Sequence, residues 1–141
     1  MSTPSSGIRD ASDRPRVLVV DDHVDSAEIL GVLLEQAGCE VRSAHSAAEA
    51  LTAAIEFLPH VALIDIVLPD MDGHDLLAAL RAQAALAGCR FVALTGYGVD
   101  DLERRGKADS FELHLTKPVD FPALYKVVFQ DHPAAQAIDS P

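Results

Sequence analysis

The chain has 141 residues, of which 49 % are hydrophobic, and this size and composition predict one globular domain rather than two domains or a disordered chain. Its formal net charge of −11 argues against unassisted binding to nucleic acid or to an anionic membrane, because both depend on basic patches. The polar N-terminus lacks the apolar segment of a secretory signal, and no stretch approaches the roughly 18 apolar residues of a membrane span, so we expect a cytoplasmic protein.

Short apolar segments alternate with amphipathic segments along residues 16–131, which we expect to form the folded body. The polar and Pro-containing ends, 1–15 and 132–141, predict flexible N-terminal and C-terminal tails. Segments rich in Val, Leu and Ile predict five buried strands, at 16–20, 40–44, 61–64, 91–94 and 112–115. Apolar periodicity and capping residues predict five helices, at 24–37, 46–57, 73–83, 100–107 and after Asp120.

This alternation predicts an α/β fold of the flavodoxin-like type. Its core would be a doubly wound, five-stranded parallel sheet in the order 2-1-3-4-5, with five helices. In such a sheet the carboxyl ends of the strands line the ligand crevice, beside the first and third strands. Residues that follow the strands are therefore the first candidates for a functional site.

Polar side chains stand at the ends of four predicted strands: Asp21 and Asp22, Asp65, Thr95, and Lys117. Three neighbouring carboxylates repel one another unless they are protonated or bridged by a cation, and hard oxygen ligands select Mg²⁺ or Mn²⁺. Because Mg²⁺ usually takes only one or two carboxylates, Asp65 at the central strand tip suits a nucleophile that forms an aspartyl phosphate. The Thr95 hydroxyl and the Lys117 ammonium would then hold the phosphoryl oxygens.

With these motifs in this order, the sequence resembles the receiver domain of the two-component response-regulator family over about residues 16–131. Asp65, in Ala-Leu-Ile-Asp-Ile-Val-Leu-Pro-Asp-Met-Asp-Gly, resembles the phospho-accepting aspartate, and Asp21-Asp22 resembles the metal-binding pair. Lys117-Pro118 resembles the family's lysine and its cis-peptide proline. The resemblance also implies that the backbone carbonyl of Val67 is a metal ligand beside the three carboxylates.

The resemblance implies a switch formed by Thr95 and His114. Receivers usually carry Tyr or Phe three residues before the conserved lysine, where this chain has His114. The segment around it resembles receivers of hybrid kinases and some stand-alone receivers. We expect His23 to be a solvated first-turn residue, Asp70 and Asp72 to shape the loop before the third helix and cap it, and the two cysteines to be structural thiols.

The implied function is that of a single-domain response regulator. It would accept a phosphoryl group on Asp65 from a histidine kinase or histidine phosphotransfer protein, with Mg²⁺ or Mn²⁺ bound. It would then signal to a protein target that the sequence does not identify, or pass the group on in a phosphorelay. It would catalyse only its own phosphorylation and dephosphorylation. We expect no DNA-binding output module, and a monomer or a weak dimer through the face formed by the fourth helix, fifth strand and fifth helix.

Two alternatives belong to other classes of protein. The first is a metal-dependent phosphohydrolase with Asp65 as nucleophile, but such enzymes usually place a second acid two residues later, where this chain has Val67. The second is a receiver-like interaction module that is never phosphorylated. The intact set of Asp21, Asp22, Asp65, Thr95 and Lys117 argues against that alternative.

Overall fold

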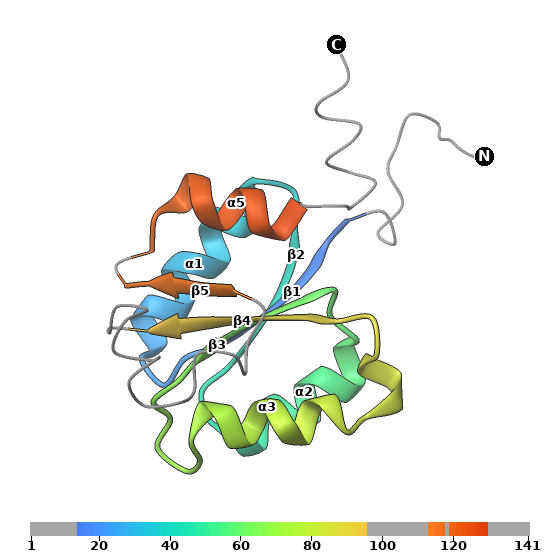
Figure 1. Ribbon diagram of the computed structural model, residues 1–141. Helices are drawn as coiled ribbons and strands as arrows, with labels where there is room; N and C mark the ends of the chain where they lie inside the picture. Colours follow the sequence, from blue (N-terminus) through green and yellow to red (C-terminus); the bar gives the residue numbers. More distant parts are fainter. Residues whose placement is uncertain (1–13, 96–112, 118, 130–141) are drawn as a thin grey trace, which may run out of the picture.

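The computed structural model describes residues 14–95, 113–117 and 119–129, which build a parallel five-stranded sheet in the order β2-β1-β3-β4-β5 (Figure 1). The strands are β1 (Arg16–Val20), β2 (Glu40–Ala44), β3 (Val61–Asp65), β4 (Arg90–Thr95) and β5 (Leu113–Thr116). The helices are α1 (Val24–Gln36), α2 (Ala47–Phe57), α3 (Gly73–Arg81) and α5 (Phe121–Phe129), with the 3₁₀ turn η2 (Ala84–Leu86). The predicted α/β class and strand order are confirmed. The helix expected at 100–107 lies outside the described residues.

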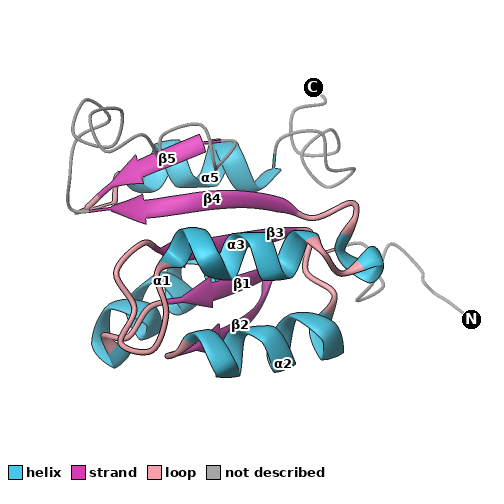
Figure 2. Ribbon diagram, turned by 60° about the horizontal axis from the view of Figure 1, so that its bottom comes forward, coloured by secondary structure: helices cyan, strands magenta, loops and turns pink. Residues whose placement is uncertain are grey.

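Helices cover both faces of the sheet, α1 and α5 on one and α2 and α3 on the other (Figures 1 and 2). Successive strand residues point to opposite faces, so each strand contributes to two separate cores. The core under α2 and α3 includes Leu18, Val20, Ala62, Ile64 and Ala93. The core under α1 and α5 includes Val17, Val19, Leu63, Val92 and Leu94. This two-sided burial explains why the strands read as continuous apolar runs.

Capping residues mark two of the helix termini. The Ser46 side chain accepts a hydrogen bond from the Glu49 N–H at 3.2 Å, as the capping-box pattern predicts. Gly38 follows α1 with a positive φ of 105°, where a glycine is favoured. The third helix is shorter than the predicted 73–83, because the chain is extended at Gln83 and then forms η2. This break turns Leu86 into the core under α2 and α3.

Three strands continue one residue beyond their predicted ends, so that Asp65, Thr95 and Thr116 belong to the sheet. Pro15, expected in the N-terminal tail, is buried, and its carbonyl accepts a hydrogen bond from the Glu40 N–H at 2.9 Å. Arg14 is exposed, and the other tail residues, 1–13 and 132–141, lie outside the described residues.

The two cysteines are buried and form no disulfide, as expected of structural thiols. Burial raises the pKa of Cys39 to about 12, so its thiol stays protonated at neutral pH. Within the described ranges, no helix combines the length and the apolar character needed to cross a membrane.

Candidate functional site

Buried polar residues concentrate at one edge of the sheet. Within the described part of the chain, three polar residues are buried: Asp21, Asp65 and Thr95, at 0 %, 6 % and 1 % exposure. Each lies at or directly after the carboxyl end of β1, β3 or β4, and these strands are neighbours in the sheet. Polar groups are rarely buried unless they are bonded or functional, so this edge is the strongest candidate for a site.

Lys117, directly after β5, joins two of these residues. Its Nζ donates hydrogen bonds to Asp65 Oδ2 at 2.9 Å and to Asp21 Oδ2 at 3.1 Å. Its backbone N–H donates to the Thr95 carbonyl at 2.7 Å, which holds the start of the β5–α5 connection against the end of β4. One ammonium therefore lies between two buried carboxylates from different strands.

Backbone N–H groups occupy the other oxygens of the same carboxylates. Asp21 Oδ1 accepts a hydrogen bond from the His23 N–H at 2.9 Å, and Asp65 Oδ1 accepts one from the Val67 N–H at 3.0 Å. In each case the side chain bonds to the backbone two residues later, as Asp commonly does in turns. These bonds orient both carboxylates and begin the loops that leave β1 and β3.

The charges of the site are unequally stabilised. Burial raises the pKa of Asp65 above its ordinary value, and the Lys117 hydrogen bond offsets this only in part. Burial also acts to raise the pKa of Asp21, but the hydrogen bonds from His23 and Lys117 together lower it. Burial acts to lower the pKa of Lys117, and its two carboxylate partners raise it instead. Asp65 thus has the less stabilised negative charge and gains more from a cation.

The remaining carboxylate, Asp22, brings the site to the surface. Its side chain is 34 % exposed, and one carboxylate oxygen each of Asp21, Asp22 and Asp65 lies, with the His23 ring, in a cluster spanning at most 4.8 Å. Three carboxylates and the Lys117 ammonium leave a formal charge of −2. Hard oxygen donors with this charge fit a divalent cation of the Mg²⁺ or Mn²⁺ type.

The loop after β3 packs tightly against the site. The Gly73 N–H donates to the Ile66 carbonyl at 2.8 Å, and Val67 forms an isolated antiparallel bridge with Asp72. A Cβ on Gly73 would lie 2.7 Å from Ile66 Cα and 2.8 Å from the Asp65 carbonyl oxygen. Only glycine allows this approach. The Val67 side chain is exposed.

Asp72 and Asp70 cap two different helices. Asp72 accepts a hydrogen bond from the His74 N–H at 2.7 Å and caps α3, as predicted. Asp70, also expected at α3, instead accepts from the N–H groups of Ala47 and Ala48 at 2.9 and 3.1 Å. Those N–H groups belong to the first turn of α2 and have no acceptor within the helix, so their bonds to Asp70 join the loop after β3 to the start of α2. These bonds lower the pKa of Asp70.

His45, which was not among the residues expected from the sequence, lies beside the site. The His45 Nδ1 lies 3.0 Å from the Asp21 carbonyl oxygen, and the His45 N–H donates to the Glu49 carboxylate at 2.9 Å. A histidine at a strand end carries no signal for such a contact, because the contact depends on β2 lying beside β1. His114, which was expected to form the switch with Thr95, is partly buried on β5 opposite Ala93 of β4. Pro118 and its expected cis peptide bond lie outside the described residues.

Comparison with known proteins places this chain in a family. The family model of the response regulator receiver domain matches residues 17–129. An uncharacterised 14.6 kDa protein of Leptolyngbya boryana is 34 % identical over 114 residues, which cover 81 % of this chain and 87 % of that protein. A CheY-like receiver domain of Methylobacillus flagellatus has 30 % identity and a TM-score of 0.71, with 89 % of this chain and 99 % of that one covered.

Longer relatives match over part of their length. The DNA-binding response regulator MtrA of Mycobacterium tuberculosis is 33 % identical over 110 residues, which are 78 % of this chain and 48 % of MtrA. The chain thus spans about half the length of that relative. The match over residues 17–129 shows that the chain belongs to the response regulator receiver domain family. Receiver domains are signalling modules of two-component systems, and their general partners are histidine kinases.

Proposed function

We propose that this chain is a phosphorylation-controlled receiver in which Asp65 accepts the phosphoryl group. An Asp65 carboxylate oxygen attacks the phosphorus of a phosphohistidine, an O–P bond forms, the P–N bond breaks, and the imidazole leaves as it takes up a proton from solvent. The donor is a histidine kinase or a histidine phosphotransfer protein.

One observation carries this proposal: Asp65 and Lys117 are in contact, with an Nζ–Oδ2 distance of 2.9 Å. A carboxylate that attacks a phosphoryl group needs a fixed positive charge beside it, because charge accumulates on the phosphoryl oxygens. The buried setting strengthens that electrostatic interaction and raises the pKa of Asp65, which makes the carboxylate more basic.

A divalent cation supplies the second charge. Asp21, Asp22 and Asp65 would hold Mg²⁺ or Mn²⁺ together with the Val67 carbonyl, and the ion would neutralise the incoming phosphoryl oxygens when bound. Lys117 bonds the Oδ2 atoms of Asp21 and Asp65, and backbone N–H groups bond their Oδ1 atoms, so the ion would share the carboxylate oxygens with these donors.

The phosphoryl group then changes the populations of two conformations. Thr95 ends β4 beside the site, and His114 is on the next strand. In the proposed switch, the Thr95 hydroxyl bonds a phosphoryl oxygen and His114 moves inward. A few kcal/mol of difference in interaction suffices for such a shift. The surface that responds includes β5, α5 and the helix expected at 100–107, and it contacts a protein target or a second copy in a weak dimer.

The test is chemical labelling with acetyl phosphate and Mg²⁺, followed by intact mass measurement. The wild-type chain should gain one phosphoryl mass, and Asp65→Asn should gain none. Asp25→Asn is the matched control, because Asp25 is an exposed aspartate in the first turn of α1 and should leave labelling unchanged. Equal labelling of Asp65→Asn and the wild type would refute the proposal. Catalytic turnover of an added phosphomonoester would point instead to a phosphohydrolase.

A further inference from the structure

His23 lies beside the acidic cluster in a way that the proposed function does not use. It is the N-cap residue of α1, yet its side chain makes no capping hydrogen bond to the helix. Instead, its Nδ1 lies 3.4 Å from Asp21 Oδ1 and 3.3 Å from Asp22 Oδ1. The ring therefore faces two carboxylates rather than the first turn of the helix.

The backbone of His23 is also bonded to this cluster. The His23 N–H donates to Asp21 Oδ1 at 2.9 Å, so the residue is tied through its own backbone to one of the carboxylates that its ring approaches. The His23 side chain is 72 % exposed, against 34 % for Asp22 and 0 % for Asp21. His23 and Asp22 thus lie on the solvent side of the cluster, and Asp21 lies on its buried side.

The spacing of these atoms matches the coordination shell of a small divalent ion. An ion with ligands at about 2.1–2.3 Å places neighbouring octahedral ligands about 3.0–3.3 Å apart. The two distances from His23 Nδ1 to carboxylate oxygens, 3.3 and 3.4 Å, are close to that range. The cluster of one nitrogen and three oxygens, at most 4.8 Å across, is also compact enough for one ion.

We propose that His23 is a ligand of the bound ion and that its imidazole makes the site select a first-row transition metal over Mg²⁺. This inference rests on the proposed function, since it concerns the same cation. Mg²⁺ strongly prefers oxygen ligands, whereas an imidazole nitrogen is a good ligand for Mn²⁺, Co²⁺ and Ni²⁺, with affinity rising in that order. A site with three carboxylates alone would show less of that preference.

The test compares the full-length wild type with His23→Gln. Titration calorimetry at about pH 8, where free imidazole is neutral, gives the affinities for Co²⁺ and Mg²⁺. We expect His23→Gln to weaken Co²⁺ binding about tenfold or more and to change Mg²⁺ binding less than about twofold. Electron spin echo measurements on the Mn²⁺-loaded protein should show modulation from a directly bound nitrogen in the wild type and none in the variant.

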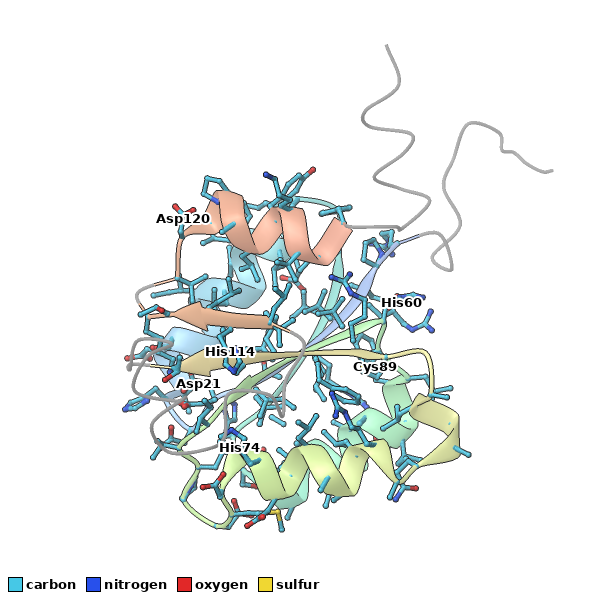
Figure 3. All side chains as sticks on the ribbon, viewed as in Figure 1. Asp21, His60, His74, Cys89, His114 and Asp120 are labelled. Carbon is cyan, nitrogen blue, oxygen red and sulfur yellow. The ribbon has the colours of Figure 1, made fainter. Side chains whose placement is uncertain are left out.

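His60→Gln is the matched control. His60 lies at the opposite end of the sheet from Asp21 (Figure 3), and its Nδ1 accepts a hydrogen bond from the Arg16 N–H. The same loss of an imidazole there should leave the Co²⁺ affinity and the nitrogen modulation unchanged, with thermal melting confirming that both variants are folded. Nitrogen modulation that persists in His23→Gln, or equal Co²⁺ affinity in His23→Gln and the wild type, overturns the proposal.

Labelling of Asp65 separates the two proposals. If acetyl phosphate with Mg²⁺ labels the wild type while His23→Gln binds Co²⁺ as tightly as the wild type does, the metal-selectivity proposal fails and the proposed function stands. If Asp65 is not labelled and no divalent ion binds, both fail.

Discussion

Gly73→Ala probes the close approach that holds the phospho-acceptor loop. The added methyl carbon would lie 2.7 Å from Ile66 Cα, whereas carbon atoms in contact are about 3.5–4.0 Å apart. The loop or the start of α3 must therefore move by about 1 Å. The neighbouring atoms belong to the backbone of Asp65 and Ile66, so no side chain can rotate away to relieve the contact.

The expected loss of stability follows from two opposing effects. Overpacking of this kind costs about 1–3 kcal/mol. Alanine is a better helix former than glycine by about 1 kcal/mol in a helix interior, and by less at the first residue of a helix, which Gly73 is in α3. The net change is a destabilisation of about 1–2 kcal/mol, or a melting temperature lower by about 4–8 °C for a body of this size.

Thermal melting with and without Mg²⁺ measures both consequences. Gly73→Ala should melt below the wild type, and its Mg²⁺-dependent gain in melting temperature should be smaller, because the displaced backbone adjoins Asp65 and Val67. Gly88→Ala is the matched control: a Cβ there meets nothing within 4 Å, so its stability should stay within about 0.5 kcal/mol of the wild type. Identical melting curves and Mg²⁺ responses for the two variants would contradict the reasoning.

Three further predictions follow from burial and capping. Without metal, Asp65→Asn should melt above the wild type at neutral pH. The pKa of Asp65 is raised in the folded protein, so the free energy of unfolding falls as pH rises from 3.8 to that raised pKa, and the loss persists at higher pH. A lower melting temperature of the variant would count against this. Asp70→Ala should lower the denaturant-derived free energy of unfolding through loss of the α2 cap, whereas no change would mean that the Ala47 and Ala48 bonds contribute nothing. The Cys39 thiol, with a pKa of about 12, should resist iodoacetamide in the folded protein near pH 8 and react on unfolding, so rapid native alkylation would disprove its burial.

The fold class could be read from the sequence because its determinants are local. Short apolar runs, such as those ending at Val20 and Ile64, are typical of strands buried on both faces. Their alternation with amphipathic segments then leaves few topologies for a parallel sheet. The same reasoning placed Asp21, Asp22, Asp65 and Lys117 at strand ends, since position along a strand is a property of the sequence.

The extent of each element was less accessible. Helix α3 ends at Arg81 because the chain turns to bury Leu86, and no local residue signals that choice. Strands β3 and β4 continue through Asp65 and Thr95 because neighbouring strands supply the hydrogen bonds of the ladder. Both features depend on residues that are distant in the chain.

The contacts that organise the site belong to the tertiary structure alone. Asp70 caps α2 rather than α3, because the loops after β2 and β3 meet. Gly73 must lack a side chain, because the loop after β3 folds back onto the backbone of Asp65 and Ile66. Lys117 bonds two carboxylates that are 52 and 96 residues away in the chain. The sequence determines which chemical groups stand at the strand ends, through the local pattern of apolar and polar residues. Which of these groups touch is decided only when the sheet orders its strands, because contact distances depend on packing between segments that the sequence keeps apart.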